Sequence, residues 1–132
     1  METNNQLTEV LRGMGVHSVF KPYRDSESGT ILLQVRKPAV IEEGQLKGLQ
    51  IEIYDPSTFR VWTPQTKKAK AYAVRYALRI RLLDGECELF IPVYLADKLL
   101  REFGAKVKRT ISGKRLDILR AFAFKKHAQE GT

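Results

Sequence analysis

Arginine and aromatic side chains that could contact a phosphate backbone are concentrated in residues 72–93 of this chain. Apolar and other residues alternate there with period two, so one face of an extended strand would carry Arg75, Arg79 and Arg81. The return segment also alternates and would add Phe90 to the same face. Guanidinium groups attract phosphates and an exposed ring stacks on a base, so the pattern indicates a nucleic-acid-binding surface. The alternative is an ordinary solvated sheet face.

A turn signal at Asp84-Gly85 joins the two halves of this segment into a predicted β-hairpin. A type I′ turn needs positive φ at both central residues, which Asp-Gly accommodates. In the register that follows, apolar side chains face one another on one side, and an ion pair and a cation–π pair form on the other. This register pairs Leu83 with Glu86, Leu82 with Cys87, Arg81 with Glu88, Ile80 with Leu89, Arg79 with Phe90 and Leu78 with Ile91.

Cations and aromatic residues outside the hairpin enlarge the predicted surface. Lysines occur in a loop expected at 63–70, and further cations in a strand expected at 105–111 and the turn after it. Tyr54 and Tyr94 are additional aromatics near the same segments. The predicted nucleic-acid-binding residues are Arg60, Trp62, Lys67, Lys68, Lys70, Arg75, Arg79, Arg81, Phe90, Lys106, Lys108, Arg109, Lys114 and Arg115.

Two of these aromatic residues have competing interpretations. Trp62 is either a stacking platform or a core residue, because tryptophan is usually well buried. Phe90 is either exposed beside Arg79 or covered by the N-terminal helix, which must pack somewhere.

The charge of the chain is uneven along its length. The formal net charge is +8, which favours an acidic partner such as nucleic acid. Residues 1–65 hold seven Lys/Arg and eight Asp/Glu, whereas residues 66–132 hold sixteen and seven. The whole positive excess therefore lies in the half that contains the predicted hairpin.

Residues suited to catalysis are scarce. His17 and His127 are the two histidines, and each is more typical of a structural or solvated side chain than of a catalytic one. One acidic grouping could hold a divalent ion: Glu42, Glu43, Glu52 and Asp55. It is a weak basis for a metal site, because Glu42 and Glu43 lie in an expected loop and adjacent residues on a strand point apart. Neither a HExxH, a paired-cysteine nor a complete phosphate-loop motif occurs. We therefore expect no enzyme activity, no metal site and no cofactor.

The single cysteine and the hydropathy pattern indicate an intracellular protein. Cys87 has no partner for a disulfide within the chain and lies on the expected apolar face of the hairpin. No segment approaches the ~18 consecutive apolar residues of a transmembrane helix. The N-terminal segment is polar and does not resemble a signal peptide. These features predict a cytoplasmic location and no membrane partner.

Changes in periodicity and turn signals predict the order of the remaining elements. A short N-terminal helix carries Leu7, Val10 and Leu11 and ends near Gly13–Gly15. A later helix lies at about 93–103, between Pro92 and Gly104. The other expected elements are a hairpin of 16–20 with 31–36, a loop at 37–48, strands at 49–54 and 59–62, and a strand or helix at 115–124.

The element order over residues 49–124 resembles the OB-fold, a five-stranded barrel with a helix between strands three and four. The fold class is therefore α+β with a largely antiparallel, strongly curved sheet, for which an OB-like barrel is one form. We expect one domain. Within it, 1–48 would form an N-terminal helix and hairpin extension, 49–124 the sheet core and 125–132 a frayed tail.

These observations predict a protein that binds single-stranded nucleic acid, DNA in preference to RNA, with low sequence specificity. The alternative is an interaction or assembly subunit of a nucleic-acid-processing or viral complex, because the charge asymmetry also suits an acidic protein. A homodimer is compatible with either. An enzyme such as a nuclease is the third hypothesis.

Overall fold

The computed structural model describes residues 4–16 and 20–107 of the 132-residue chain. Several sequence predictions lie outside these residues: Lys108, Arg109, Lys114, Arg115, both histidines, the element expected at 115–124 and the tail at 125–132.

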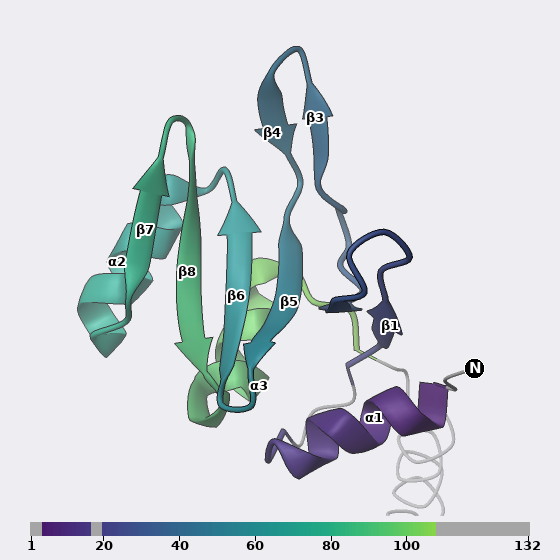
Figure 1. Cartoon of the computed structure of the whole chain (residues 1–132). Helices are drawn as coiled ribbons and strands as arrows, with labels where there is room; N and C mark the ends of the chain where they lie inside the picture. Colours follow the sequence, from purple (N-terminus) through teal and green to yellow (C-terminus); the bar gives the residue numbers. More distant parts are fainter. Residues whose placement is uncertain (1–3, 17–19, 108–132) are drawn as a thin grey trace, which may run out of the picture.

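An antiparallel sheet of six strands forms the frame of the described structure (Figure 1). Its strand order is β1-β2-β5-β6-β8-β7, and every neighbouring pair is antiparallel. A separate two-stranded ribbon joins β3 to β4. The elements are α1 (Asn4–Gly13), β1 (Pro22–Arg24), β2 (Ile31–Leu33), β3 (Val40–Glu42), β4 (Gln45–Lys47), β5 (Gln50–Asp55), β6 (Thr58–Thr63), α2 (Thr66–Tyr76), β7 (Ile80–Leu83), β8 (Glu86–Pro92) and α3 (Val93–Phe103). The α+β class and the mainly antiparallel sheet are confirmed.

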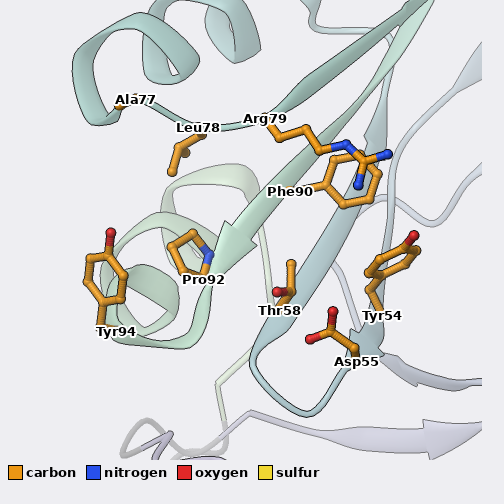
Figure 2. A pocket seen from close by; sticks show the side chains of 9 residues that line it. All are labelled: Tyr54, Asp55, Thr58, Ala77, Leu78, Arg79, Phe90, Pro92 and Tyr94. Carbon is orange, nitrogen blue, oxygen red and sulfur yellow. The ribbon is translucent and has the colours of Figure 1, made fainter.

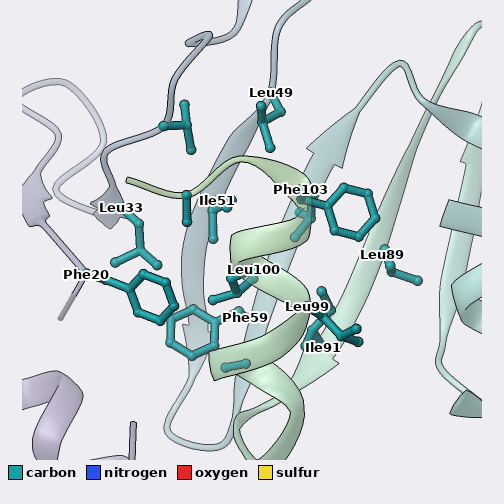
Figure 3. Close-up of a cluster of buried hydrophobic side chains, with 14 of the residues drawn as sticks. Phe20, Leu33, Leu49, Ile51, Phe59, Leu89, Ile91, Leu99, Leu100 and Phe103 are labelled. Atoms are coloured by element: carbon teal, nitrogen blue, oxygen red, sulfur yellow. The ribbon is translucent and has the colours of Figure 1, made fainter. Parts of the chain in front are cut away.

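Helix α3 packs on the inner face of the sheet and builds the core there (Figure 3). Its spacing of apolar residues puts Leu99 and Leu100 against the strands, and both are fully buried. On β6 and β8 every second side chain points to this inner face, so Phe59 and Leu89 are buried as well. The predicted helix and its end at Gly104, which adopts φ +118°, are confirmed.

Helix α2 lies beside β7 on the same side of the sheet, whereas none of the helices in residues 4–16 and 20–107 covers the outer face of the central strands (Figure 1). The ring of Tyr72 in α2 meets that of Phe103 in α3 at 5.3 Å between centroids. Helix α1 sits near β1, where Leu11 joins the core. It therefore does not cover Phe90, contrary to one of the two sequence interpretations.

The hairpin predicted at 72–93 is wrong at its start, over residues 72–76, because residues 66–76 form helix α2. The loop predicted at 63–70 is wrong for the same reason. Ala69 and Ala73, four residues apart, are buried against the sheet, and Tyr72 flanks them. Alternation of alanine with tyrosine or valine satisfies a strand pattern and a helix pattern alike, and alanine favours the helix. The helix ends at Ala77, which adopts the left-handed conformation with φ 56°.

The rest of the hairpin, from Ile80 to Pro92, has the predicted register. β7 and β8 pair Ile80 with Leu89 and Arg81 with Glu88, around the turn at Gly85. The turn is not of the predicted type I′, because Gly85 has positive φ, at 76°, whereas Asp84 does not. The two-residue loop and the side-chain pattern still specify the predicted register.

Three smaller expectations changed. The predicted loop at 37–48 contains the β3–β4 ribbon, whose turn places Glu43 and Gly44 at φ 52° and 75°. A first hairpin is present, in which β1 pairs with β2, and residues 17–19 of the strand predicted at 16–20 lie outside the described residues. In place of a strand beginning at residue 105, the described part shows isolated bridges from Ala105 and Val107.

The sheet is open in the described residues, because its edge strands β1 and β7 do not pair with each other. The OB-like barrel thus stays a prediction, as do the domain boundaries. Strand β2 pairs with β5, so the expected extension and the expected core share one sheet. None of the helices in the described residues has the length and apolar character needed to cross a membrane.

The left-handed residue at the end of α2 offers a test of this helix. A side chain is strained at positive φ, so Ala77→Gly should raise the free energy of unfolding by about 0.5–1 kcal/mol. Ala71→Gly, in the exposed middle of the same helix, should lower it by about 1 kcal/mol. Urea denaturation measures both. Changes of the same sign would contradict a helix that ends at residue 77.

Candidate nucleic-acid interface

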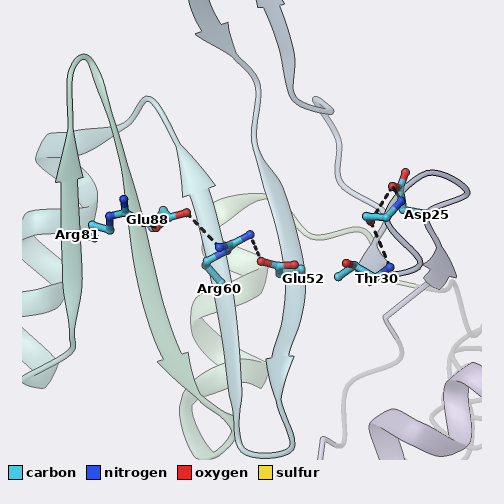
Figure 4. Close-up of polar contacts among 7 residues, drawn as sticks. Asp25, Thr30, Glu52, Arg60, Arg81 and Glu88 are labelled. Atoms are coloured by element: carbon cyan, nitrogen blue, oxygen red, sulfur yellow. Dashed lines mark hydrogen bonds and ion pairs between the residues drawn. The ribbon is translucent and has the colours of Figure 1, made fainter.

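A ladder of alternating charges crosses the outer face of the sheet (Figure 4). Arg60 on β6 contacts Glu52 on β5 and, at 3.2 Å, Glu88 on β8. Arg81 on β7 lies 3.3 Å from the other oxygen of Glu88. Cross-strand register produces this arrangement, because Glu52 faces Arg60 and Glu88 faces Arg81. We call these four residues the charge ladder.

Both carboxylates of the charge ladder are buried although no helix of the described residues covers them, each being only 8% exposed. Burial raises the pKa of Glu52, Arg60 opposes this rise, and Glu88 adds to it. Arg60 therefore offsets part of the cost of burying the Glu52 carboxylate.

The outer face is not the basic surface that the sequence predicted. Over β5 to β7 its charged side chains are Arg60, Arg79, Arg81, Glu52, Asp55, Glu86 and Glu88. Four carboxylates stand against three cations, so this face carries no positive excess. Trp62 is half-buried here and donates its indole N–H to Glu86 at 2.6 Å, which makes it a structural side chain rather than a free platform.

The predicted pair of Arg79 and Phe90 is present. The guanidinium carbon lies 4.4 Å from the ring centroid, and the backbone N–H of Phe90 donates to the carbonyl of Arg79 at 3.0 Å. Tyr54 contacts the same ring edge-on at 5.0 Å between centroids. Phe90 is only 7% exposed as a result, so the prediction that it faces solvent is wrong. The planar group exposed to solvent is instead the guanidinium of Arg79, which stacks on the ring of Phe90.

A cavity of about 250 Å³ lies at this end of the outer face (Figure 2). We call it the aromatic pocket. Tyr54 and Tyr94 stand on opposite sides of it and are 47% and 78% exposed. Its lining residues are Tyr54, Asp55, Thr58, Ala77, Leu78, Arg79, Phe90, Pro92 and Tyr94.

A β-bulge in β5 explains why two consecutive residues reach this pocket. The pairing passes from Ile53 opposite Phe59 to Asp55 opposite Thr58, which leaves Tyr54 as the extra residue. On a regular strand, Tyr54 and Asp55 would point to opposite faces. The bulge brings both to the aromatic pocket.

The carboxylate of Asp55 is ionised in this position. Its Oδ1 accepts the backbone N–H of Ser57 at 2.8 Å and the hydroxyl of Ser57 at 3.1 Å. The backbone hydrogen bond from Ser57 is the main reason that the pKa of Asp55 falls below its usual value. The aromatic pocket therefore has a permanent acceptor on one wall and a cation at its rim.

Helix α2 carries the basic surface. Lys67, Lys70 and Arg75 are exposed, and the helix contains no acidic residue. Lys68 instead turns toward α3, where it donates to the carbonyl of Glu102. The helix leads into Ala77 and Leu78 of the aromatic pocket, and Arg75 is the exposed cation of α2 nearest to them in the chain, whereas Lys67 and Lys70 belong to its N-terminal half.

The remaining predicted site residue within the described range is Lys106. It is exposed and borders a different cavity with Lys21 and Arg36. The predicted surface is thus divided among the charge ladder, α2 and this separate region. Sequence reasoning considered Asp55 only for a divalent ion and did not include Thr58, although the Asp-Pro-Ser turn after a strand marks the position of both.

No group of three or more metal-binding side chains occurs among the residues that the structure describes. Cys87 is buried, and desolvation raises its thiol pKa. Comparison with protein-family models, curated proteins and solved structures finds no match to this chain.

The charge ladder predicts unequal effects for its two arginines. Arg60→Ala removes the ion-pair partner of the buried Glu52 and leaves Glu88 with Arg81 alone, so it should cost about 3 kcal/mol of unfolding free energy at pH 7. Arg81 is 64% exposed in its side chain, so Arg81→Ala should cost less than about 1 kcal/mol.

The cost of Arg60→Ala should also depend on pH. Losing Arg60 raises the pKa of Glu52 further above its unfolded value, so the folded state binds the proton first as pH falls. The difference from the wild type should shrink between pH 7 and pH 5 in urea denaturation. A difference independent of pH would contradict this role of Arg60.

Proposed function

We propose that this protein binds single-stranded nucleic acid, with one base held in the aromatic pocket. The observation that carries the proposal is the convergence of two exposed tyrosines, Tyr54 and Tyr94, with the supported guanidinium of Arg79 around one cavity. Aromatic rings and guanidinium planes are the groups on which unpaired bases stack. The cavity is smaller than the roughly 300–1,000 Å³ typical of drug-sized ligands, which suits one base better than a whole nucleotide.

The backbone of the strand would run from the aromatic pocket along α2. Lys67, Lys70 and Arg75 present long cationic side chains there without acidic neighbours in the helix. Phosphates attracted to these groups release counterions, which stabilises the complex at low salt. This path replaces the sheet face as the electrostatic part of the mechanism, because the charge ladder is already neutralised internally.

Single strands are favoured over duplexes because an unpaired base is free to leave its stack and enter the pocket. The groove-reading geometry of a helix-turn-helix unit is not needed for this mechanism. Single-stranded DNA is the first ligand to test.

Fluorescence anisotropy with labelled oligonucleotides tests the proposal. Single-stranded DNA should bind more tightly than duplex DNA of the same length, and its affinity should fall between 50 and 200 mM salt. Lys67→Gln and Lys70→Gln, made singly, should each reduce the slope of log affinity against log salt by about 0.7.

Lys47→Gln is the matched control, since Lys47 is an exposed lysine on the β3–β4 ribbon. It should leave the slope unchanged. Absence of single-strand binding at low salt would contradict the proposal.

The two tyrosines of the aromatic pocket should each contribute to affinity. Loss of one base–aromatic stack costs ~1–3 kcal/mol, so Tyr94→Ala and Tyr54→Ala should weaken binding about 5- to 100-fold. Tyr23→Ala removes an exposed tyrosine from β1, outside the pocket, and should have little effect. Equal losses for Tyr23 and Tyr94 would show that the pocket is not the stacking site.

A second candidate function, a protein-interaction module, rests on the edge strand β7. Leu82 is 55% exposed on this strand, and the nearby helix α2 exposes 85% of Val74. Such an edge is suited to strand addition by another chain. Dimerisation in light scattering, combined with no oligonucleotide binding, would favour this candidate.

A further inference from the structure

We propose that the aromatic pocket selects the base it holds, with a preference for guanine, and that Asp55 determines this specificity. The inference deepens the proposed function and rests on it. It concerns one base position and therefore remains compatible with low specificity along the rest of the strand.

The pocket contains a fixed acceptor next to its stacking surfaces. The bulge in β5 turns Asp55 to the same side as Tyr54, and Ser57 anchors the carboxylate through Oδ1. Thr58 also hydrogen-bonds to this carboxylate, which faces the cavity as an acceptor that the turn holds in place. Figure 2 shows the carboxylate beside Thr58, across the cavity from Arg79. A base stacked beside Tyr54 would therefore present its edge to a carboxylate.

The edges of the four bases differ in what they offer to a carboxylate. Guanine presents two adjacent donors, N1–H and the 2-amino group, which match a carboxylate in the charge-assisted geometry. Adenine and cytosine offer one exocyclic amino group each. Thymine and uracil offer a single N–H between two carbonyl oxygens, and those oxygens repel a carboxylate. The expected order is guanine, then adenine and cytosine, then thymine.

The same carboxylate directs the ligand's orientation. An ionised Asp55 repels phosphate, whereas Arg79 at the rim and the cations of α2 attract it. The base edge therefore points toward Asp55, and the backbone lies toward α2. A free phosphate group is not the ligand of this pocket.

The test uses the full chain and an oligothymidylate that carries one central guanine, inosine, adenine, cytosine or thymine. Anisotropy should show that guanine binds about 5- to 100-fold more tightly than thymine. Inosine, which lacks the 2-amino group, should lose most of this advantage. Asp55→Asn keeps an oxygen for Ser57 but replaces the other acceptor with an amide donor, so it should abolish the preference for guanine.

Asp25→Asn is the matched control. Asp25 also accepts from the backbone N–H and hydroxyl of a nearby serine, Ser28, at 2.9 and 2.8 Å, and it lies in the β1–β2 turn away from the pocket (Figure 4). It should retain the preference for guanine. Tight binding with equal affinity for guanine and thymine would overturn the inference while the proposed function stands. Failure to bind any of the oligonucleotides would overturn both. A preference for guanine that survives Asp55→Asn would overturn the role of Asp55.

Discussion

The packing of α3 against the inner face of β5, β6 and β8 is the interaction on which the rest of this structure depends. Leu99 and Leu100 meet the inward residues of the strands and are removed from water completely. Helix α2 lies on the same side, so within the described part of the chain no helix packs on the outer face of the central strands. Polar residues of that face must therefore find their partners on the neighbouring strands.

The charge ladder and the shielded ring of Phe90 both show outer-face side chains paired with side chains of neighbouring strands. Arg60 is placed between Glu52 and Glu88 by the cross-strand register, so it compensates both carboxylates at once. Phe90 is covered by Arg79 and Tyr54 rather than by a helix. In both cases side chains of adjacent strands shield or neutralise a group on the outer face. The cations that take part are no longer free for a ligand.

The aromatic pocket forms where the regular pattern of the outer face stops. The bulge at Tyr54 and the left-handed residue at Ala77 both interrupt their elements beside it. Such irregularities are enriched near binding sites because they redirect side chains that a regular strand or helix would point elsewhere. Here they bring together stacking groups, a cation and an ionised carboxylate from four elements that are separate in the sequence.

The sequence by itself determined the features that depend on local pattern: the amphipathic α3 with its terminal Gly104, the strands around Asp55-Pro56, and the register of β7 with β8. Each of these is specified by a periodicity together with a turn or cap, so two local signals agree. Residues 66–76 were assigned wrongly because alanine with alternating tyrosine and valine fits both periods. Only the position of the segment against β7, β8 and α3 decides between them. Tertiary structure alone also decided which cations are free. Pairing across strands and the choice of two neighbouring side chains at a bulge depend on contacts between distant segments, which composition and spacing do not encode.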